Sequence, residues 1–331
     1  MRNTRIRFCA VLALLAFAWA CYPESQVSYS NPQTSVNQWL IEFKTDEAKV
    51  QLTMRYRRER TTGFDSYSNT GFGIELGQLA GLTREQVLST TGANVRFQLK
   101  RDAGTFNFEG WFKDGNGSGH FTFSPNSSFA NDLGRLGYGR ANDDQLLSLA
   151  MSDVGFTYIN ELKSQGYDTT TVEQLVRMGH HGGGLEYLQG LKSLGFSVKT
   201  TDLVVRMKDH GVSLNFIREL SALGYSNLTP EELVRTKDHG VSGKFINDFM
   251  AAGYERADLN QWIRLKDHGV SPAFVKELKE MGYERVPLDQ LVRLKNHGVS
   301  ADYIRRMKEK GYGDLALDEY IRMRNRGERD E

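Results

Sequence analysis

Cysteine is scarce in this chain of 331 residues, which has only Cys9 and Cys21, both near the N-terminus. Two cysteines in these positions cannot form a disulfide framework that holds a folded domain together. An excess of charge is missing too, because 42 basic residues face 41 acidic ones and the formal net charge is +1. This balance excludes the chain-wide positive field that attracts nucleic acid. We therefore expect no nucleic-acid partner.

The common short signatures of catalysis are also absent. The sequence has no His-Glu-x-x-His zinc-peptidase motif, no Gly-x-Ser-x-Gly nucleophile elbow and no phosphate-binding glycine loop. It therefore assigns no catalytic residue, no metal ligand and no cofactor. A binding protein is the favoured interpretation, and a metal-dependent or hydrolytic enzyme is the alternative.

Residues 1–20 have the pattern of a secretory signal peptide. Arginines precede an apolar core of about ten residues, 8–17, which is too short to span a bilayer. The small residues Ala18 and Ala20 then suit a cleavage site. The pattern predicts secretion across the inner membrane, to the periplasm or to a membrane anchor.

Cleavage after Ala20 makes Cys21 the first residue of the mature chain, which is the position that is lipidated in bacterial lipoproteins. Such proteins usually have Leu where this chain has Ala18, and Trp19 is bulky, so a free thiol at Cys21 is the alternative. Several acyl chains would hold the protein at a membrane, whereas one chain binds marginally. Residues 21–38 are polar and contain two prolines, which predicts a flexible tether.

Residues 39–126 have a sequence pattern that is typical of β structure. Val50, Leu52 and Met54 alternate with polar residues, which is the period of a strand with one exposed face. Similar alternation recurs to about residue 123, and residues 82–88 read as a short helix with Thr83 and Gln86 as a capping box. We predict a small antiparallel β domain of four to six strands.

Two features of this domain suggest chemistry. Asp114, Asn116 and Ser118 match the first half of an EF-hand calcium loop, but the position of the bidentate Glu is Pro125. A hairpin turn is therefore the favoured interpretation of this stretch. The second feature is a cluster of basic residues that could form a patch for a partner, consisting of Arg55, Arg57, Arg58 and Arg60.

Residues 127–327 repeat with a period of 29, followed by a charged tail at 328–331. A fixed period in this range predicts a stack of supersecondary units. Each unit has an aromatic residue followed eight residues later by a glycine, and the register holds over seven units. The aromatic residues are Phe129, Tyr158, Tyr187, Phe216, Phe245, Phe274 and Tyr303.

Each unit reads as two short amphipathic helices. Thr229-Pro230 and Ser271-Pro272 are helix starts, while Gly240 and Gly253 are stops that favour the left-handed conformation. Helices of roughly ten residues are not stable alone, so their apolar faces must be buried against neighbouring units. The chain is thus expected to be α+β and multidomain, with a β domain followed by an α-solenoid of seven helical hairpins.

Polar residues repeat in the same register and form an Arg ladder and a His ladder. Members of the two ladders stand four residues apart and share a helix face. The favoured interpretation is structural, with His at helix ends and Arg bridging units, and the alternative is a binding face. Zinc is not expected, because stacked helices lie roughly 8–10 Å apart and zinc bonds are about 2 Å. The ladders are Arg177, Arg206, Arg235, Arg264 and Arg293, and His181, His210, His239, His268 and His297.

Residues 94–112 and 119–126, followed by the Asp-His-Gly-Val-Ser repeats, carry a family resemblance. Over roughly residues 40–327 the chain resembles the extracytoplasmic tail of bacterial membrane metallopeptidases of the β-lactam-sensor, antirepressor class. It also resembles uncharacterised secreted proteins, chiefly acidobacterial, built from the same two parts. The peptidase's zinc motif and membrane helices are missing here, so no catalytic residue carries over. The resemblance implies a stand-alone sensor or interaction tail, with a protein or cell-envelope ligand as partner.

Overall fold

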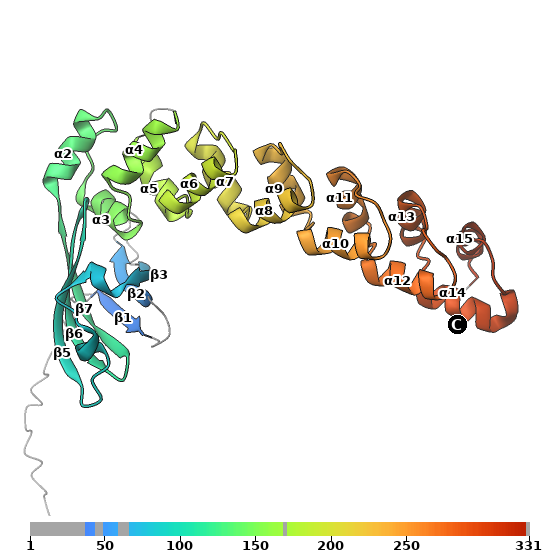
Figure 1. Cartoon of the computed structure of the whole chain (residues 1–331), viewed down its shortest axis with the longest axis horizontal. Coiled ribbons are helices and arrows are strands. Elements are labelled where there is room, and N and C mark those ends of the chain that lie inside the picture. The colour runs from blue at the N-terminus through green and yellow to red at the C-terminus, as the bar shows by residue number, and fades with distance from the viewer. Residues whose placement is uncertain (1–36, 44–48, 59–65, 168–170, 329–331) are drawn as a thin grey trace, which may run out of the picture.

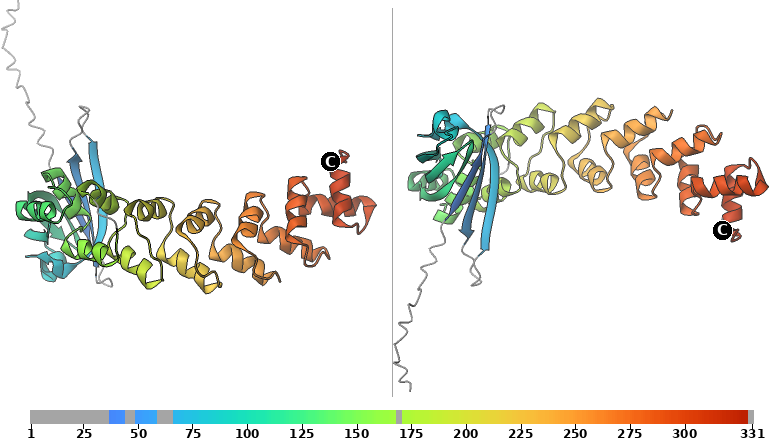
Figure 2. Two further views of the ribbon diagram at one scale, coloured as in Figure 1. Left: turned by 90° about the horizontal axis from the view of Figure 1, so that it is seen from above. Right: turned by 90° about the horizontal axis from the view of Figure 1, so that it is seen from below.

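The computed structural model describes residues 37–43, 49–58, 66–167 and 171–328. The expected signal peptide, Cys21, the tether up to residue 36 and Arg60 lie outside these ranges. An antiparallel sheet forms one end of the molecule, and helices extend from it in an elongated array (Figure 1). The two further views of Figure 2 show the C-terminus at the far end of the array. The mixed α and β composition predicted from the sequence is thus confirmed.

The sheet has seven antiparallel strands in the order β3-β2-β1-β7-β6-β5-β4. A short η1 (Leu76–Gln78) precedes β4, and α1 (Arg84–Val87) lies between β4 and β5. The capping box predicted for α1 is present, because Thr83 and Gln86 each bond the other's backbone N–H. The strands are β1 (Gln38–Glu42), β2 (Lys49–Arg58), β3 (Ser66–Glu75), β4 (Leu79–Ala80), β5 (Ala93–Arg101), β6 (Gly104–Lys113) and β7 (Asn116–Pro125).

Apolar side chains on one face of the sheet form its core. Trp39 lies at the centre of an aromatic cluster, with its ring centroid 5.2 Å from that of Phe97 and 5.5 Å from that of Phe112. Val50, Leu52 and Met54 are fully buried beside it, as their alternation predicts. The opposite, outer face carries the polar members of the same alternation.

The predicted number of four to six strands is wrong, and so is the end of the tether. β3 lacks a clear alternation because Gly71 and Gly73 occupy its outward positions, and β4 is too short to produce a pattern. The tether was expected to reach residue 38, but Gln38 begins β1 and pairs with Arg55 and His120. The glycines thus hid the edge strand β3 from the sequence analysis, and the polar residue Gln38 hid the start of β1.

The stretch that resembles a calcium loop is the tight turn of the β6–β7 hairpin. Lys113 pairs with Asn116, and the two turn residues between them, Asp114 and Gly115, have φ of 50° and 81°. Positive φ at both central positions defines the turn type that matches strand twist. Asn116 and Ser118 belong to β7 and pair with residues of β1 and β6, and the Asn116 amide donates a hydrogen bond to the Asp114 carbonyl within the turn.

The remaining chain forms helices in two rows, in which most helices pack on the next but one (Figure 1). The odd-numbered helices from α3 to α9 contact in succession, and so do the even-numbered helices from α4 to α14. A short η2 (Lys308–Tyr312) follows α14. The helices are α2 (Ser127–Arg135), α3 (Asp143–Met151), α4 (Phe156–Ser164), α5 (Val172–His180), α6 (Leu185–Ser193), α7 (Thr201–Asp209), α8 (Leu214–Ala222), α9 (Pro230–Asp238), α10 (Gly243–Ala251), α11 (Leu259–Asp267), α12 (Pro272–Glu280), α13 (Leu288–Asn296), α14 (Ala301–Met307) and α15 (Leu317–Asn325).

The helix ends follow the capping chemistry of the sequence. Thr229 and Glu232 form a capping box with Pro230 in the first turn of α9, and Ser271 caps α12. At the end of α10, Gly253 has a φ of 99° and the Tyr254 N–H donates to the Phe249 carbonyl, which is the predicted Schellman arrangement. Each cap of this kind contributes about 1 kcal/mol.

Buried apolar residues form one core that continues from the sheet through the helices. All seven repeated aromatic residues belong to it. No helix in the described part of the chain has both the length and the apolar character needed to cross a bilayer.

A carboxylate from the sheet joins the two parts of the molecule. Asp102, in the β5–β6 turn, accepts a hydrogen bond of 2.7 Å from the Phe156 N–H in the first turn of α4. Gly155 occupies the N-cap of α4 and offers no side-chain acceptor. The neighbouring Arg101 forms an ion pair with Asp153. Asp102 therefore caps α4 from another element and fixes the start of the array on the sheet.

We expect Asp102→Ala to lower the free energy of unfolding by about 1 kcal/mol, because no other side chain in the described residues accepts a hydrogen bond from the α4 N-terminus. Asp102→Asn keeps an oxygen acceptor and should retain most of that stability. Urea unfolding followed by circular dichroism measures both. Asp132→Ala, which removes an ion pair within α2, is the control and should cost only a few tenths of a kcal/mol. Equal midpoints for the Ala variant and the wild type would contradict the capping role.

Candidate binding face of the helical array

The His ladder lies at the C-terminal ends of the odd-numbered helices. His181, His210 and His239 are the C-cap residues of α5, α7 and α9, and each donates its backbone N–H to the carbonyl of the ladder Arg four residues earlier. His268 and His297 do the same in α11 and α13. The two ladders are therefore tied to each other through the backbone.

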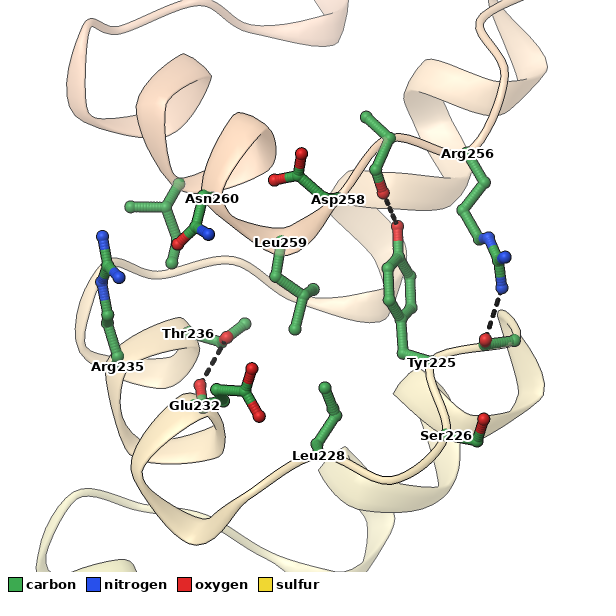
Figure 3. A pocket seen from close by; sticks show the side chains of 13 residues that line it. Tyr225, Ser226, Leu228, Glu232, Arg235, Thr236, Arg256, Asp258, Leu259 and Asn260 are labelled. Carbon is green, nitrogen blue, oxygen red and sulfur yellow. Dashed lines mark hydrogen bonds between the residues drawn. The ribbon is translucent and has the colours of Figure 1, made fainter.

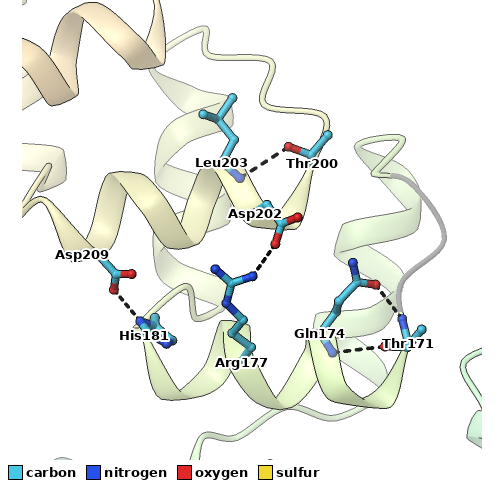
Figure 4. A network of polar contacts seen from close by, with 8 residues as sticks. All are labelled: Thr171, Gln174, Arg177, His181, Thr200, Asp202, Leu203 and Asp209. Carbon is cyan, nitrogen blue, oxygen red and sulfur yellow. Dashed lines mark hydrogen bonds and ion pairs between the residues drawn. The ribbon is translucent and has the colours of Figure 1, made fainter.

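The His side chains bond the following unit. The Nδ1 atoms of His210 and His239 lie 2.7 Å from an Oδ1 atom of Asp238 and Asp267, respectively. His181 bonds Asp209 in the same way (Figure 4). An ionised carboxylate only accepts hydrogen bonds, so Nδ1 carries the proton in these pairs. Each Asp thus serves the His of the preceding unit and not the His that follows it in the sequence.

Among the ladder histidines of the described chain, only His297 bonds a side-chain amide. His297 Nδ1 lies 2.9 Å from Asn325 Oδ1. His268 has Asn296 at the corresponding position, and within the described residues no bond joins the two side chains. The carboxylate partners of the ladder therefore end with Asp267, and an amide takes that role only for His297.

Most of the Arg ladder also bridges units. Arg177 and Arg264 each place Nη1 2.5 Å from Oδ1 of an aspartate on the next odd-numbered helix, Asp202 and Asp289. Arg293 Nη2 lies 3.3 Å from Asp318 Oδ1. These side chains are about half exposed, so each pair is worth at most about 1 kcal/mol. The structural interpretation of the ladders holds at these positions.

Two positions break the Arg ladder. Arg206 and Arg235 face Glu231 and Asn260 at the positions where the other arginines meet aspartate. Among the residues that the structure describes, neither guanidinium has an ion-pair or hydrogen-bond partner. For Arg235 the reason is chemical, because the Asn260 amide carries no charge to pair with it.

Arg235 lines a cleft of about 410 Å³ between α9 and α11 (Figure 3). These two helices are packed less closely than α7 with α9 or α11 with α13. Leu228, Leu259 and Ile263 provide apolar surface within the cleft, and Arg235 and Asn260 lie together at one side of it. The cleft therefore offers an unpaired cation beside apolar surface.

The other charged groups of the cleft are already bonded. Glu232 accepts from Thr229 in the α9 capping box, and Asp258 accepts from the Gln261 N–H at the start of α11. The Arg256 guanidinium donates to the Gly224 carbonyl and lies 5.4 Å from the Tyr225 ring centroid. An incoming carboxylate would therefore find Arg235 as its available partner.

The sequence analysis missed a third ladder, made of lysines above aromatic rings. Lys208 Nζ lies 4.7 Å from the ring centroid of Tyr187, and Lys295 Nζ lies 4.3 Å from that of Phe274. Lys237 and Lys266 repeat the contact over Phe216 and Phe245. Exposed contacts of this type contribute about 0.5–1 kcal/mol. The signal was present, because these lysines recur with the same period two residues before four of the five ladder histidines, and only His181 has a glycine there.

The other candidates from the sequence are placed only in part. Arg55 lies on the outer face of β2, whereas the side chains of Arg57 and Arg58 fall outside the described part of the chain, as does all of Arg60. In the described residues no three side chains of His, Cys, Asp or Glu come together as a metal would require. No ligand set can therefore be named for the alternative of a metal-dependent enzyme.

Buried tyrosines of the array predict sensitivity to alkali. Burial raises the pKa of Tyr167 to about 12 and raises the pKa of Tyr158 and Tyr187 strongly. The Tyr158 and Tyr187 hydroxyls each donate a 2.8 Å hydrogen bond to a carbonyl of the next unit. Because the folded pKa lies above the ordinary value of 10, the protonated form stabilises the fold below pH 10. That stability is lost as the pH rises through the folded pKa.

We therefore expect helical circular dichroism to fall only above pH 10, together with tyrosinate absorbance at about 295 nm from the buried rings. A titration that follows both signals on one sample is the measurement. Tyr158→Phe, which removes one such proton, should make the loss less steep. Ionisation of every tyrosine near pH 10 with unchanged dichroism would contradict the expectation.

Comparisons with protein-family models, with curated proteins and with solved structures gave no match to this chain.

Proposed function

We propose that this chain is a non-enzymatic extracytoplasmic binding protein of the sensor type, held at a membrane by a lipid on Cys21. In this proposal residues 127–327 form an α-solenoid of seven 29-residue repeats that binds an acidic segment of a protein partner. The resemblance to the repeat tails of sensor-class metallopeptidases agrees with this role. The signal-peptide pattern supports the extracytoplasmic location.

The observation that carries the proposal is the unpaired Arg235 in the cleft between α9 and α11. Other arginines of its register, such as Arg177 and Arg264, are bonded to an aspartate of the next unit. A guanidinium favours a carboxylate in a two-pronged geometry, which adds specificity to attraction. The apolar residues around it favour a segment with an apolar neighbour beside its acidic residue.

Protein is the favoured partner because the array offers a long surface on both sides of the cleft (Figure 1). Stacked helical units commonly bind extended partners along such surfaces. Contacts with the flanking lysines and histidines would add to the central contact at Arg235, since the energy of a protein interface concentrates in a few central residues.

The test is photo-cross-linking in envelope extract, with a benzoylphenylalanine placed at Ser226 on the rim of the cleft. Arg235→Ala should reduce the yield of the cross-linked partner roughly tenfold. Arg264→Ala removes the same charge from an ion pair one unit further on and serves as the matched control. Equal yields from the Arg235 variant and the wild type would remove the cleft from the proposal.

Asn260→Asp is a second test, because it should raise stability and lower the yield of the cross-linked partner. It supplies the carboxylate that Asp289 provides to Arg264 one unit later. We expect stability to rise by about 0.3–1 kcal/mol while the partner yield falls, because Arg235 is then paired within the chain. A variant that is neither more stable nor poorer in binding would contradict the proposal that Asn260 leaves Arg235 available to a partner.

The lipid anchor is tested separately. Labelled palmitate fed to the expressing bacterium should appear in the wild-type protein and not in Cys21→Ser. Wild-type protein without label would overturn the anchor and leave the cleft untouched.

A further inference from the structure

A second cavity lies on the outer face of the sheet, on the other part of the molecule from the Arg235 cleft. It has a volume of about 650 Å³ and is lined from β1, β2, β3, β6 and β7. The function proposed for the helices does not use it. We call it the sheet groove.

The strand register places apolar and small side chains in one row across the sheet groove. Trp111 of β6 pairs with Ser118 of β7, Ser118 pairs with Leu40 of β1, and Leu40 pairs with Thr53 of β2. Trp111 and Leu40 are 49% and 57% exposed, which is unusual for side chains of this size. The short Ser118 between them leaves a depression bounded by an indole and an isobutyl group.

The next row of the same register is polar. His120 of β7 pairs with Gln38 of β1, Gln38 pairs with Arg55 of β2, and Arg55 pairs with Asn69 of β3. All four residues line the sheet groove. An imidazole and two side-chain amides thus stand one step along the strands from the indole, and together they both donate and accept hydrogen bonds.

The floor of the sheet groove is backbone held in a fixed position. Gly110 and Gly119 pair with each other, and a Cβ on either would lie within about 2 Å of a carbonyl oxygen, 2.1 Å for Gly110 and 2.0 Å for Gly119. Beneath them the buried Trp39 donates its indole N–H to the Glu109 and His120 carbonyls, both at 3.1 Å. A shallow site with a rigid floor loses little entropy when a ligand binds.

We propose that the sheet groove binds a glycan. A pyranose ring has an apolar C–H face that packs on an aromatic ring and a rim of hydroxyls that both donate and accept hydrogen bonds. The Trp111 indole suits that face, and the row of His120, Gln38 and Asn69 suits that rim. The volume is large enough for a segment of a few sugars.

A folded protein partner fits the sheet groove less well. The centre of a protein interface is a continuous apolar patch from which water is excluded. Here the two apolar side chains are separated by Ser118 and bordered by amides and an imidazole. Such alternation matches a ligand whose own surface alternates between C–H and hydroxyl groups.

The test is calorimetric titration of the full mature chain with three hexasaccharides, of β-1,4-linked N-acetylglucosamine, β-1,4-linked glucose and α-1,4-linked galacturonic acid. At least one should bind, and Trp111→Ala should weaken its affinity roughly tenfold or more. Leu40→Ser should weaken it as well. Met250→Ser removes a comparably exposed apolar side chain from the array and is the matched control, which should bind as the wild type does.

A second readout does not depend on a variant. In ¹H–¹⁵N spectra the indole N–H signal of Trp111 should shift on titration, while that of Trp262, which is buried in the helical array, should not. Absence of binding to all three glycans, or binding that Trp111→Ala leaves unchanged, overturns the proposal. So does a Trp111 signal that moves with phosphatidylglycerol vesicles and with none of the glycans.

Discussion

Trp262→Ala should lower the free energy of unfolding by about 3–5 kcal/mol. The Trp262 side chain is fully buried, with its ring centroid 5.4 Å from that of Phe249. Its indole N–H donates a 2.6 Å hydrogen bond to the Tyr225 hydroxyl, which in turn donates to the Ala257 carbonyl. Removing the indole leaves a cavity and takes away a partner of a half-buried hydroxyl, so two penalties add.

The matched variant is Trp262→Leu, because leucine occupies the same register in α9 and α13 as Leu233 and Leu291. It keeps an apolar side chain of moderate size, so we expect roughly half the loss seen with alanine. Chemical denaturation of both variants, followed by far-ultraviolet circular dichroism and by intrinsic fluorescence, measures these losses. Losses below about 1 kcal/mol for both would show that the core collapses around the site and that the packing argument is wrong.

Gly119→Ala should be similarly severe, with a loss of about 3 kcal/mol or more and partial loss of the sheet. The added Cβ would lie 2.0 Å from the Glu109 carbonyl oxygen and 2.6 Å from the Gly110 Cα, and neither group can move without breaking the β6–β7 ladder. Stability and near-ultraviolet dichroism of the purified variant are the measurements.

Gly134→Ala is the control for this prediction, because nothing lies within 4 Å of its added Cβ on α2. Glycine within a helix costs roughly 0.5–1 kcal/mol relative to alanine, so this variant should be more stable than the wild type. A Gly119 variant with wild-type stability would mean that β6 and β7 separate freely, in conflict with the close pairing described above.

The helices could be predicted in detail because their signals are local. Caps such as Thr229 and stops such as Gly253 act within a few residues of their position. The fixed period makes the same signals recur along the chain, so each prediction supports the others. β3 was missed because Gly71 and Gly73 remove the side chains that would show an alternation. A strand defined mainly by pairing with its neighbour leaves little trace in its own sequence.

The candidate sites could be predicted only in outline, because they depend on which residues meet across units or strands. The sequence placed Arg235 on a ladder, but its lack of a partner follows from Asn260, a residue on the next odd-numbered helix. The sheet groove depends on the register of strands from residue 38 to residue 120, which no local pattern fixes. Sequence spacing thus indicated the candidate residues. Their partners were decided by the packing of helices and by the register of strands.

The missing ion pair at Arg235 also has a mechanical consequence. The helices follow one another in an elongated array, so a pull between the sheet and the C-terminal end acts on the contacts between successive helices (Figure 1). The α9–α11 joint lacks the Arg–Asp pair that the α11–α13 joint has, and it is packed less closely than the joints on either side. We therefore expect the array to bend more easily between α9 and α11 than at the two neighbouring joints, and a partner bound there would stiffen it.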